Sequence, residues 1–106
     1  MSFDIWMSKD RDYKVDFSIG YAKWGLLDEI FEHKSFWFDN IDEKRVEDTI
    51  DILILAMSKL IKLPKEGVLP NGRVYTRSNH SSLIENLKYM IESSEENKGY
   101  FWNVSL

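Results

Sequence analysis

The chain of 106 residues contains no cysteine. This absence excludes a disulfide framework and thiolate metal sites, and it suits a reducing compartment. Long hydrophobic runs are also missing, because the longest run, Ile52 to Met57, is far shorter than the roughly 20 residues that cross a bilayer. The N-terminus has no basic segment followed by an apolar one, so no secretory signal is visible. Together these absences lead us to expect a cytoplasmic protein that does not enter a membrane.

Catalytic and nucleotide-binding motifs are absent as well. The five glycines form neither GxxxxGK[ST] nor GxGxxG, so no phosphate-binding loop is predicted. Neither His33 nor His80 has a second histidine, a cysteine or an acid at the spacing of a known metal site. The acidic residues lack the glycine-bearing spacing of a calcium loop. We therefore expect no enzyme, no metal and no cofactor.

Positive charge is in the minority, with 14 Lys and Arg against 18 Asp and Glu and a formal net charge of −4. Binding to nucleic acid is disfavoured, because it is driven by cations that neutralise phosphates. A basic cluster could still form a modest nucleic-acid footprint; its members are Lys59, Lys62, Lys65, Arg73 and Arg77. An acidic protein is better suited to a basic protein partner.

The residues that are present predict one globular domain spanning 1–106, with 43% hydrophobic and 14% aromatic residues. Residues 3–8 and 13–18 alternate apolar and polar side chains on either side of a charged turn, which predicts a β-hairpin. In the second run, the alternation places Tyr13, Val15 and Phe17 on one face.

Helical spacing of apolar residues predicts three helices. The first covers 19–34, with Ser18 as its N-cap, and the second covers 42–63, with Asn40 and Glu43 as a capping box. The third begins near Ser81 or Ser82, with Ser82 and Glu85 as another capping box, and its expected buried stripe is Leu83, Leu87 and Met90. The apolar stripe of the second helix is so wide that we expect a central helix contacted on several sides; it comprises Val46, Ile50, Leu53, Ile54, Met57, Leu60 and Ile61.

Two short strands complete the predicted layout. Residues 74–76 favour a short strand, and the aromatic C-terminus, 100–106, follows the helix stop signals Lys98 and Gly99. Burial of Tyr100, Trp102 and Val104 on one face would offset the cost of ordering the tail, so we expect this segment to pair with the N-terminal hairpin. The fold class is then α+β, a small antiparallel sheet packed against about three helices in the order β-β-α-α-α-β.

Six acids between residues 39 and 51 form the first candidate site. Glu43, Glu47 and Asp51 are spaced at i, i+4 and i+8, which places them on one face of the predicted second helix. Asp39, Asp42 and Asp48 lie close to them in the sequence. Two interpretations are open: a solvated face at a dipole-favoured helix start, or an acidic patch for a basic protein surface.

The aromatic run Phe36-Trp37-Phe38 lies in a predicted connection between helices. Three consecutive rings cannot all face one core, so at least one of them is expected to be exposed or to cover a helix end. Because tryptophan beside acids is typical of interface anchors, Trp37 is the candidate anchor of a partner-binding site. The alternative is that these rings cap the core.

His80 lies in a polar stretch, 76–82, that contains several hydroxyl groups. A histidine base with neighbouring hydroxyls is one possible hydrolytic site, although serine and asparagine before a helix are also ordinary capping residues. His33 falls at the end of the predicted first helix, where a cation would interact favourably with the helix dipole.

The length, acidity, absence of cysteine, aromatic content and lack of a catalytic motif resemble those of the small bacterial immunity proteins that neutralise cognate toxins, including those of contact-dependent growth inhibition. The order of "MSFDIW", helices, "PNG", a further helix and "FWNVSL" also resembles a family of small phage and bacterial proteins, which implies no function. Neither resemblance implies particular site residues.

Our leading hypothesis is therefore an immunity protein that covers the active site of a toxin, a basic nuclease. The six acids would steer the encounter and Trp37 would anchor the complex. The alternatives are a phage-borne inhibitor of host defence or an accessory interaction protein, and then a small hydrolase that uses His80.

Overall fold

A three-stranded antiparallel sheet brings the two ends of the chain together in the computed structural model, which describes residues 2–32, 35–70 and 72–106. Strand β1 (Ser2–Lys9) pairs with β2 (Asp12–Gly20) in the expected hairpin, and its other edge pairs with β5 (Phe101–Ser105). The strand order is β2-β1-β5. Both the α+β class and the pairing of the C-terminal segment with the hairpin are confirmed.

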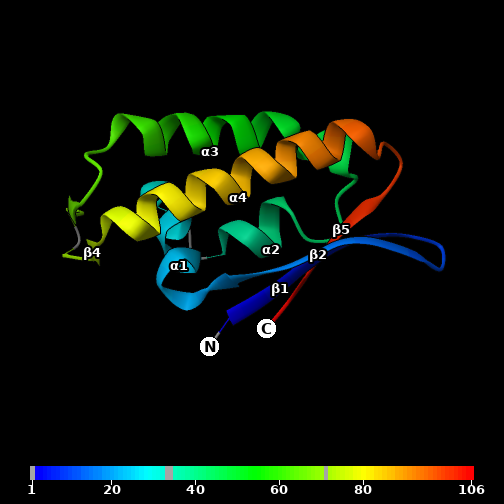
Figure 1. Ribbon diagram of the computed structural model, residues 1–106, viewed down its shortest axis with the longest axis horizontal. Helices are drawn as coiled ribbons and strands as arrows, with labels where there is room; N and C mark the ends of the chain where they lie inside the picture. The colour runs from blue at the N-terminus through cyan, green and yellow to red at the C-terminus, as the bar shows by residue number, and fades with distance from the viewer. Residues whose placement is uncertain (1, 33–34, 71) are drawn as a thin grey trace.

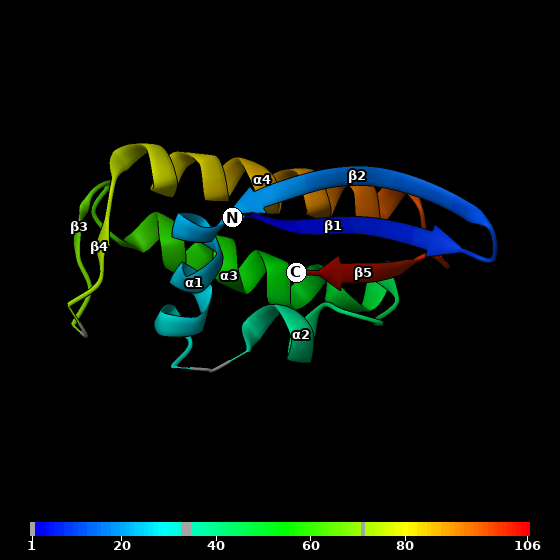
Figure 2. The ribbon, with the colours of Figure 1, turned by 90° about the horizontal axis from the view of Figure 1, so that it is seen from below.

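The helices cover one face of this sheet and leave the other face open (Figures 1 and 2). Helix α4 contacts β2, helix α1 contacts both β1 and β2, and helix α3 packs on α4 at the side farthest from the sheet. A second sheet of two short strands lies at one end of the molecule. The remaining elements are α1 (Tyr21–Ile30), α2 (Phe36–Asn40), the 3-10 turn η1 (Val46–Thr49), α3 (Ile50–Lys62), β3 (Gly67–Val68), β4 (Val74–Tyr75) and α4 (Arg77–Glu96).

The core lies between the inner face of the sheet and the helices. Phe3, Ile5 and Met7 alternate along β1 and are buried, and Trp102 and Val104 of β5 are buried beside them. The register pairs Ile5 with Val104 and Met7 with Trp102. Burial of Trp102 and Val104 offsets the cost of ordering this strand, because each large side chain contributes about 2–3 kcal/mol when buried. Tyr100 is only partly buried and Phe101 is exposed.

A β-bulge in β2 places Tyr13 on the face of the sheet opposite to the predicted one. The register of the hairpin shifts between Ile5 and Met7, and Val15 has a φ of 55°. An extra residue in one strand reverses the alternation of side chains beyond it. Phe17 therefore faces inward and packs against the core, whereas Tyr13 is 67% exposed. The prediction that these two side chains share a face was wrong.

The first predicted helix is shorter than expected. Helix α1 begins at Tyr21 after Gly20, and it ends at Ile30. Ser18 is not an N-cap, because it belongs to β2 and its hydroxyl donates a hydrogen bond to Asp4 at 2.7 Å. The predicted helix end at His33 and Lys34 lies outside the described residues.

The predicted helix 42–63 is two elements preceded by a turn. The residues that follow α2 form turns in which Glu43 has a φ of 64°, then η1, and α3 begins only at Ile50. Asn40 does not cap this helix, because it belongs to α2 and its side-chain amide donates to the carbonyl of Phe36. Helix α3 is also not central. Its outer face leaves Ile54, Leu55 and Ile61 exposed.

The last helix starts earlier than predicted. Thr76 and Asn79 form the capping box, in which the Thr76 hydroxyl accepts from the Asn79 amide at 3.0 Å. The Asn79 side chain in return accepts from the Thr76 amide at 3.2 Å. Ser81 and Ser82 therefore lie inside α4. The predicted buried stripe of this helix is confirmed; it comprises Leu83, Leu87 and Met90.

Candidate interaction surface

The acidic segment after α2 lies along the outer edge of β5 instead of on a helix (Figure 2). The Glu43 amide donates to the Trp102 carbonyl at 2.8 Å, and the Trp102 amide donates to the Lys44 carbonyl at 2.9 Å. The Val46 amide donates to the Tyr100 carbonyl at 2.9 Å. Since an unpaired strand edge can pair with another chain, this backbone cover protects β5.

Two of the six candidate acids serve this same contact with their side chains. The Asp42 carboxylate accepts from the Val104 amide at 2.9 Å. Both carboxylate oxygens of Glu47 accept from the Gly99 amide at 3.1 Å. This hydrogen bond to Gly99 lowers the pKa of Glu47 below its ordinary value of 4.5. Asp42 and Glu47 are therefore structural residues that hold the C-terminal strand.

The other four acids are exposed. They are Asp39 on α2, Glu43 in the turn, Asp48 in η1 and Asp51 in the first turn of α3. Glu43, Glu47 and Asp51 do not share one helix face, because η1 and the turn before it interrupt the helix. In the described part of the chain, Glu43, Asp48 and Asp51 form no ion pair, so their charges face solvent. No metal-binding group of three or more ligands is found among the described residues.

Trp37 belongs to the core. It lies on α2, not in a connection, and is fully buried. Its indole nitrogen donates to the Trp24 carbonyl at 3.0 Å, and the two indole rings stack with centroids 5.1 Å apart. A buried side chain cannot contact a partner, so Trp37 is not a surface anchor. Phe38 is the exposed ring of the run, as expected for at least one of the three.

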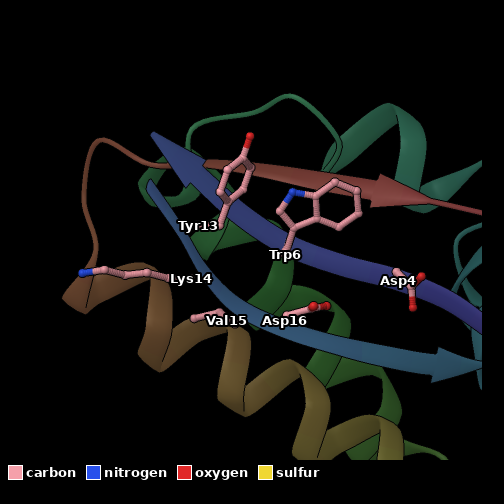
Figure 3. Close-up of a pocket in the computed structure, with 6 residues that line it drawn as sticks. All are labelled: Asp4, Trp6, Tyr13, Lys14, Val15 and Asp16. Atoms are coloured by element: carbon pink, nitrogen blue, oxygen red, sulfur yellow. The ribbon is translucent and has the colours of Figure 1, made fainter. Parts of the chain in front are cut away.

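The open face of the sheet carries a different pair of aromatic side chains. Trp6 and Tyr13 rise side by side from β1 and β2 (Figure 3). They line a shallow hollow of about 520 Å³ together with Asp4, Lys14, Val15 and Asp16. The Lys14 ammonium is turned away from the two rings, towards Tyr100 and Asn97. Asp4 is held by the hydrogen bond from Ser18. This arrangement combines two large, partly apolar rings with two carboxylates on a rigid strand scaffold.

The signal for half of this surface was present in the sequence. Trp6 alternates with the buried Ile5 and Met7, so a strand must place its ring on the opposite face. Tyr13 could not have been assigned to the same face, because its orientation depends on the bulge at Val15.

His80 is buried in the first turns of α4, and only 6% of it is exposed. Its Nε2 lies 2.6 Å from the Leu60 carbonyl oxygen, and its ring stacks on Tyr75 with centroids 6.1 Å apart. Within the described ranges, no serine or carboxylate forms a hydrogen bond with His80. The described residues therefore do not assemble a serine–histidine–acid arrangement around it.

The predicted basic cluster is spread over several elements. Arg73 lies 3.6 Å from Glu29, and the Lys59 ammonium lies over the ring of Phe31 at 5.3 Å. Lys65 and Arg77 line a separate hollow near His80. These four cations therefore have different neighbours and do not form a single cluster.

Compared with protein families, with curated proteins and with solved structures, this chain matches none of them. Helix α4, at 20 residues, is the longest in the described part of the chain, and neither it nor another helix there has the length and apolar character to cross a membrane.

Proposed function

We propose that this chain is an immunity-type binding protein that neutralises a basic toxin, a nuclease, by covering its active site in the cytoplasm. The observation that carries the proposal is the open sheet face, where Trp6 and Tyr13 line a hollow with Asp4 and Asp16, and where the ammonium of Lys14 is turned away towards Tyr100. Tryptophan and tyrosine are the side chains that most often dominate binding energy at protein interfaces. Trp6 and Tyr13 take the anchoring role that the sequence had suggested for Trp37.

The charge of the chain supports the choice of partner. A nuclease binds phosphates with a positively charged cleft, and a surface of opposite charge accelerates the encounter with such a cleft. The net charge is −4, and the exposed Glu43, Asp48 and Asp51 add to the carboxylates of the sheet face. In this proposal the acids steer association, whereas the two rings slow dissociation.

The rigidity of the sheet also supports a role in binding a protein partner. The inner face of β1 is packed by core residues, and β5 is paired on one edge with β1 and on the other with the segment that follows α2. Side chains on a scaffold that is already ordered lose little conformational entropy on binding. The open face can therefore present Trp6 in one arrangement, and β2 holds Tyr13 next to it through its pairing with β1.

The test is titration of the purified chain against the toxin domain encoded by the adjacent gene. We expect the association rate to fall at least tenfold as the salt concentration rises from about 0.1 M to about 1 M, where the Debye length falls from about 10 Å to about 3 Å. Asp48→Asn with Asp51→Asn should lower the association rate and leave the dissociation rate unchanged. Glu32→Gln with Glu66→Gln is the matched control, because these exposed acids lie outside the 39–51 segment, just after α1 and just before β3.

The aromatic pair is tested by Trp6→Ala with Tyr13→Ala, which should raise the dissociation rate by about 100-fold. Leu55→Ala is the matched control, because Leu55 is a large exposed apolar side chain on the outer face of α3. Association and dissociation rates that change neither with the salt concentration nor with the sheet-face substitutions would contradict the proposal. Binding to a basic protein of the host in place of a toxin would favour the phage-borne or accessory inhibitor.

A further inference from the structure

A second hollow is lined by residues where α3 ends and α4 begins. These two helix ends lie at the end of the molecule that carries β4 (Figure 1). The hollow's volume of about 550 Å³ falls within the range of roughly 300–1,000 Å³ that is typical of small-molecule sites. The walls are mainly apolar and are formed by Ile61, Leu63, Pro64 and Ile84. Ile61 is 61% exposed, so the apolar wall is accessible from solvent.

The polar side chains of this hollow carry a net positive charge in an acidic protein. Lys65 and Arg77 are the cations and Glu85 is the acid, which leaves one positive charge when His80 is neutral. Neither Lys65 nor Arg77 forms an ion pair with a described residue. Their charges are therefore available to an anion that enters the hollow.

His80 forms a buried polar part of the same wall. A carbonyl oxygen only accepts hydrogen bonds, so the 2.6 Å contact with the Leu60 carbonyl places a proton on Nε2 of His80. Its Nδ1 has no hydrogen-bond partner among the described residues. The Tyr75 ring stacks on His80, and the Tyr75 hydroxyl donates to the Pro64 carbonyl at 2.8 Å. These contacts hold the polar and apolar sides of the hollow in place before any ligand arrives.

We propose that this hollow binds a small organic monocarboxylate with an apolar chain, a function separate from the capture of a protein partner. The apolar chain lies against Ile61, Leu63 and Ile84, and the carboxylate lies between Lys65 and Arg77. The planar guanidinium of Arg77 matches a carboxylate with two parallel hydrogen bonds. One net positive charge and an adjacent Glu85 favour a monoanion over a phosphate dianion.

The test uses octanoate as the probe and methyl NMR spectra of the full chain as the readout. Saturable shifts are expected for the methyl groups of Ile61 and Ile84 and for the ring of His80. Ile5, Ile19 and Ile41 serve as internal controls, because they are fully buried and do not line this hollow. 1-Octanol should bind more weakly than octanoate, and octyltrimethylammonium should not bind.

Substitutions at the rim separate charge recognition from simple apolar binding. Arg77→Gln should weaken octanoate about threefold, which is the scale of one exposed ion pair, and should leave 1-octanol unchanged. Glu85→Gln should strengthen octanoate. Lys88→Gln is the control, since Lys88 is an exposed cation of α4 outside the hollow. Shifts that do not saturate, or equal binding of octanoate and 1-octanol with no effect of Arg77→Gln, would overturn the proposal.

Discussion

Thr49 connects two elements through a single buried hydroxyl group. The hydroxyl donates to the Val46 carbonyl at 2.7 Å and accepts from the indole nitrogen of Trp102 at 3.1 Å. One hydroxyl can serve as donor and acceptor at the same time, so both buried partners are satisfied. Thr49 thereby fastens the C-terminal strand to η1.

Replacing Thr49 with valine keeps the shape of the side chain but leaves the Trp102 N–H without a partner. We expect Thr49→Val to lower the free energy of unfolding by about 1–3 kcal/mol, measured by urea denaturation. Thr49→Ser is the control, because it keeps the hydroxyl and loses one methyl group worth about 0.8 kcal/mol. A Thr49→Val variant more stable than Thr49→Ser would contradict this role.

Glu47 should make the stability of the protein depend on pH. The Gly99 amide lowers the pKa of Glu47 in the folded protein, so the ionised carboxylate stabilises the fold. This contribution is fully present above the ordinary value of 4.5 and is lost as the pH falls through the lower pKa of the folded state. The stability difference between the wild type and Glu47→Gln should therefore shrink as the pH falls from about 7 to about 3.

Chemical denaturation of both proteins across this pH range provides the measurement. Glu96→Gln is the control for a change of charge alone, because Glu96 is exposed and its carboxylate forms no hydrogen bond with a described residue. A constant difference between wild type and Glu47→Gln at all pH values would show that the contact with Gly99 does not depend on ionisation.

At the scale of elements, β5 joins the sheet to the rest of the fold. It is hydrogen-bonded to β1 on one edge and to the segment 43–46 on the other, and it buries Trp102 and Val104. A chain that stops at Gly99 loses these two buried side chains, at about 2–3 kcal/mol each, and exposes the partners on β1. Since small domains are stable by only about 5–15 kcal/mol, we expect this truncation to abolish folding.

Circular dichroism melting and the dispersion of amide NMR signals would measure the effect of the truncation. Removal of Leu106 alone is the control, because this residue lies beyond the strand and is 80% exposed. A chain ending at Gly99 that melts cooperatively at the temperature of the full chain would disprove the role assigned to β5.

Elements whose apolar side chains recur at a regular spacing could be predicted from the sequence. The alternation of Phe3, Ile5 and Met7 and the helical stripe of Leu83, Leu87 and Met90 both reflect burial on one face, and the structure confirms both. The start of α3 could not be predicted, because helical apolar spacing continues through Val46 and η1. Backbone hydrogen bonds to β5 decide that the preceding residues form turns instead of a helix.

At the scale of the whole molecule, the four tryptophans divide into one partly exposed residue and three buried ones. Trp24, Trp37 and Trp102 belong to the core, whereas Trp6 lies on the open sheet face. Acrylamide, which is uncharged, should therefore quench mainly the fluorescence of Trp6. In the Trp6→Phe variant we expect most of the quenchable emission to disappear, with the melting temperature little changed.

Trp24→Phe is the comparison for this measurement, because Trp24 is buried and stacks on Phe3 and Trp37. It should leave the quenchable fraction in place and lower the melting temperature. Efficient quenching that persists in Trp6→Phe would mean that the buried tryptophans are accessible to acrylamide. It would contradict the division into one partly exposed and three buried tryptophans.

The candidate surface could be predicted from the sequence only in part. The acids of residues 39–51 are close in sequence, yet Asp42 and Glu47 are used to bind the backbone of β5. Sequence proximity does not report hydrogen bonds to residues that lie 62 and 52 positions away in the chain. Trp37 likewise lies beside acids in the sequence but points into the core.

The amino-acid sequence by itself determined the α+β class, the hairpin, the C-terminal strand and the buried stripe of the last helix. Each of these depends on a local period of apolar side chains that has one favourable way to be buried. The tertiary structure alone decided the bulge at Val15, the start of α3 and which acids remain exposed. These features depend on hydrogen bonds and register between segments far apart in the chain, which a local pattern does not encode.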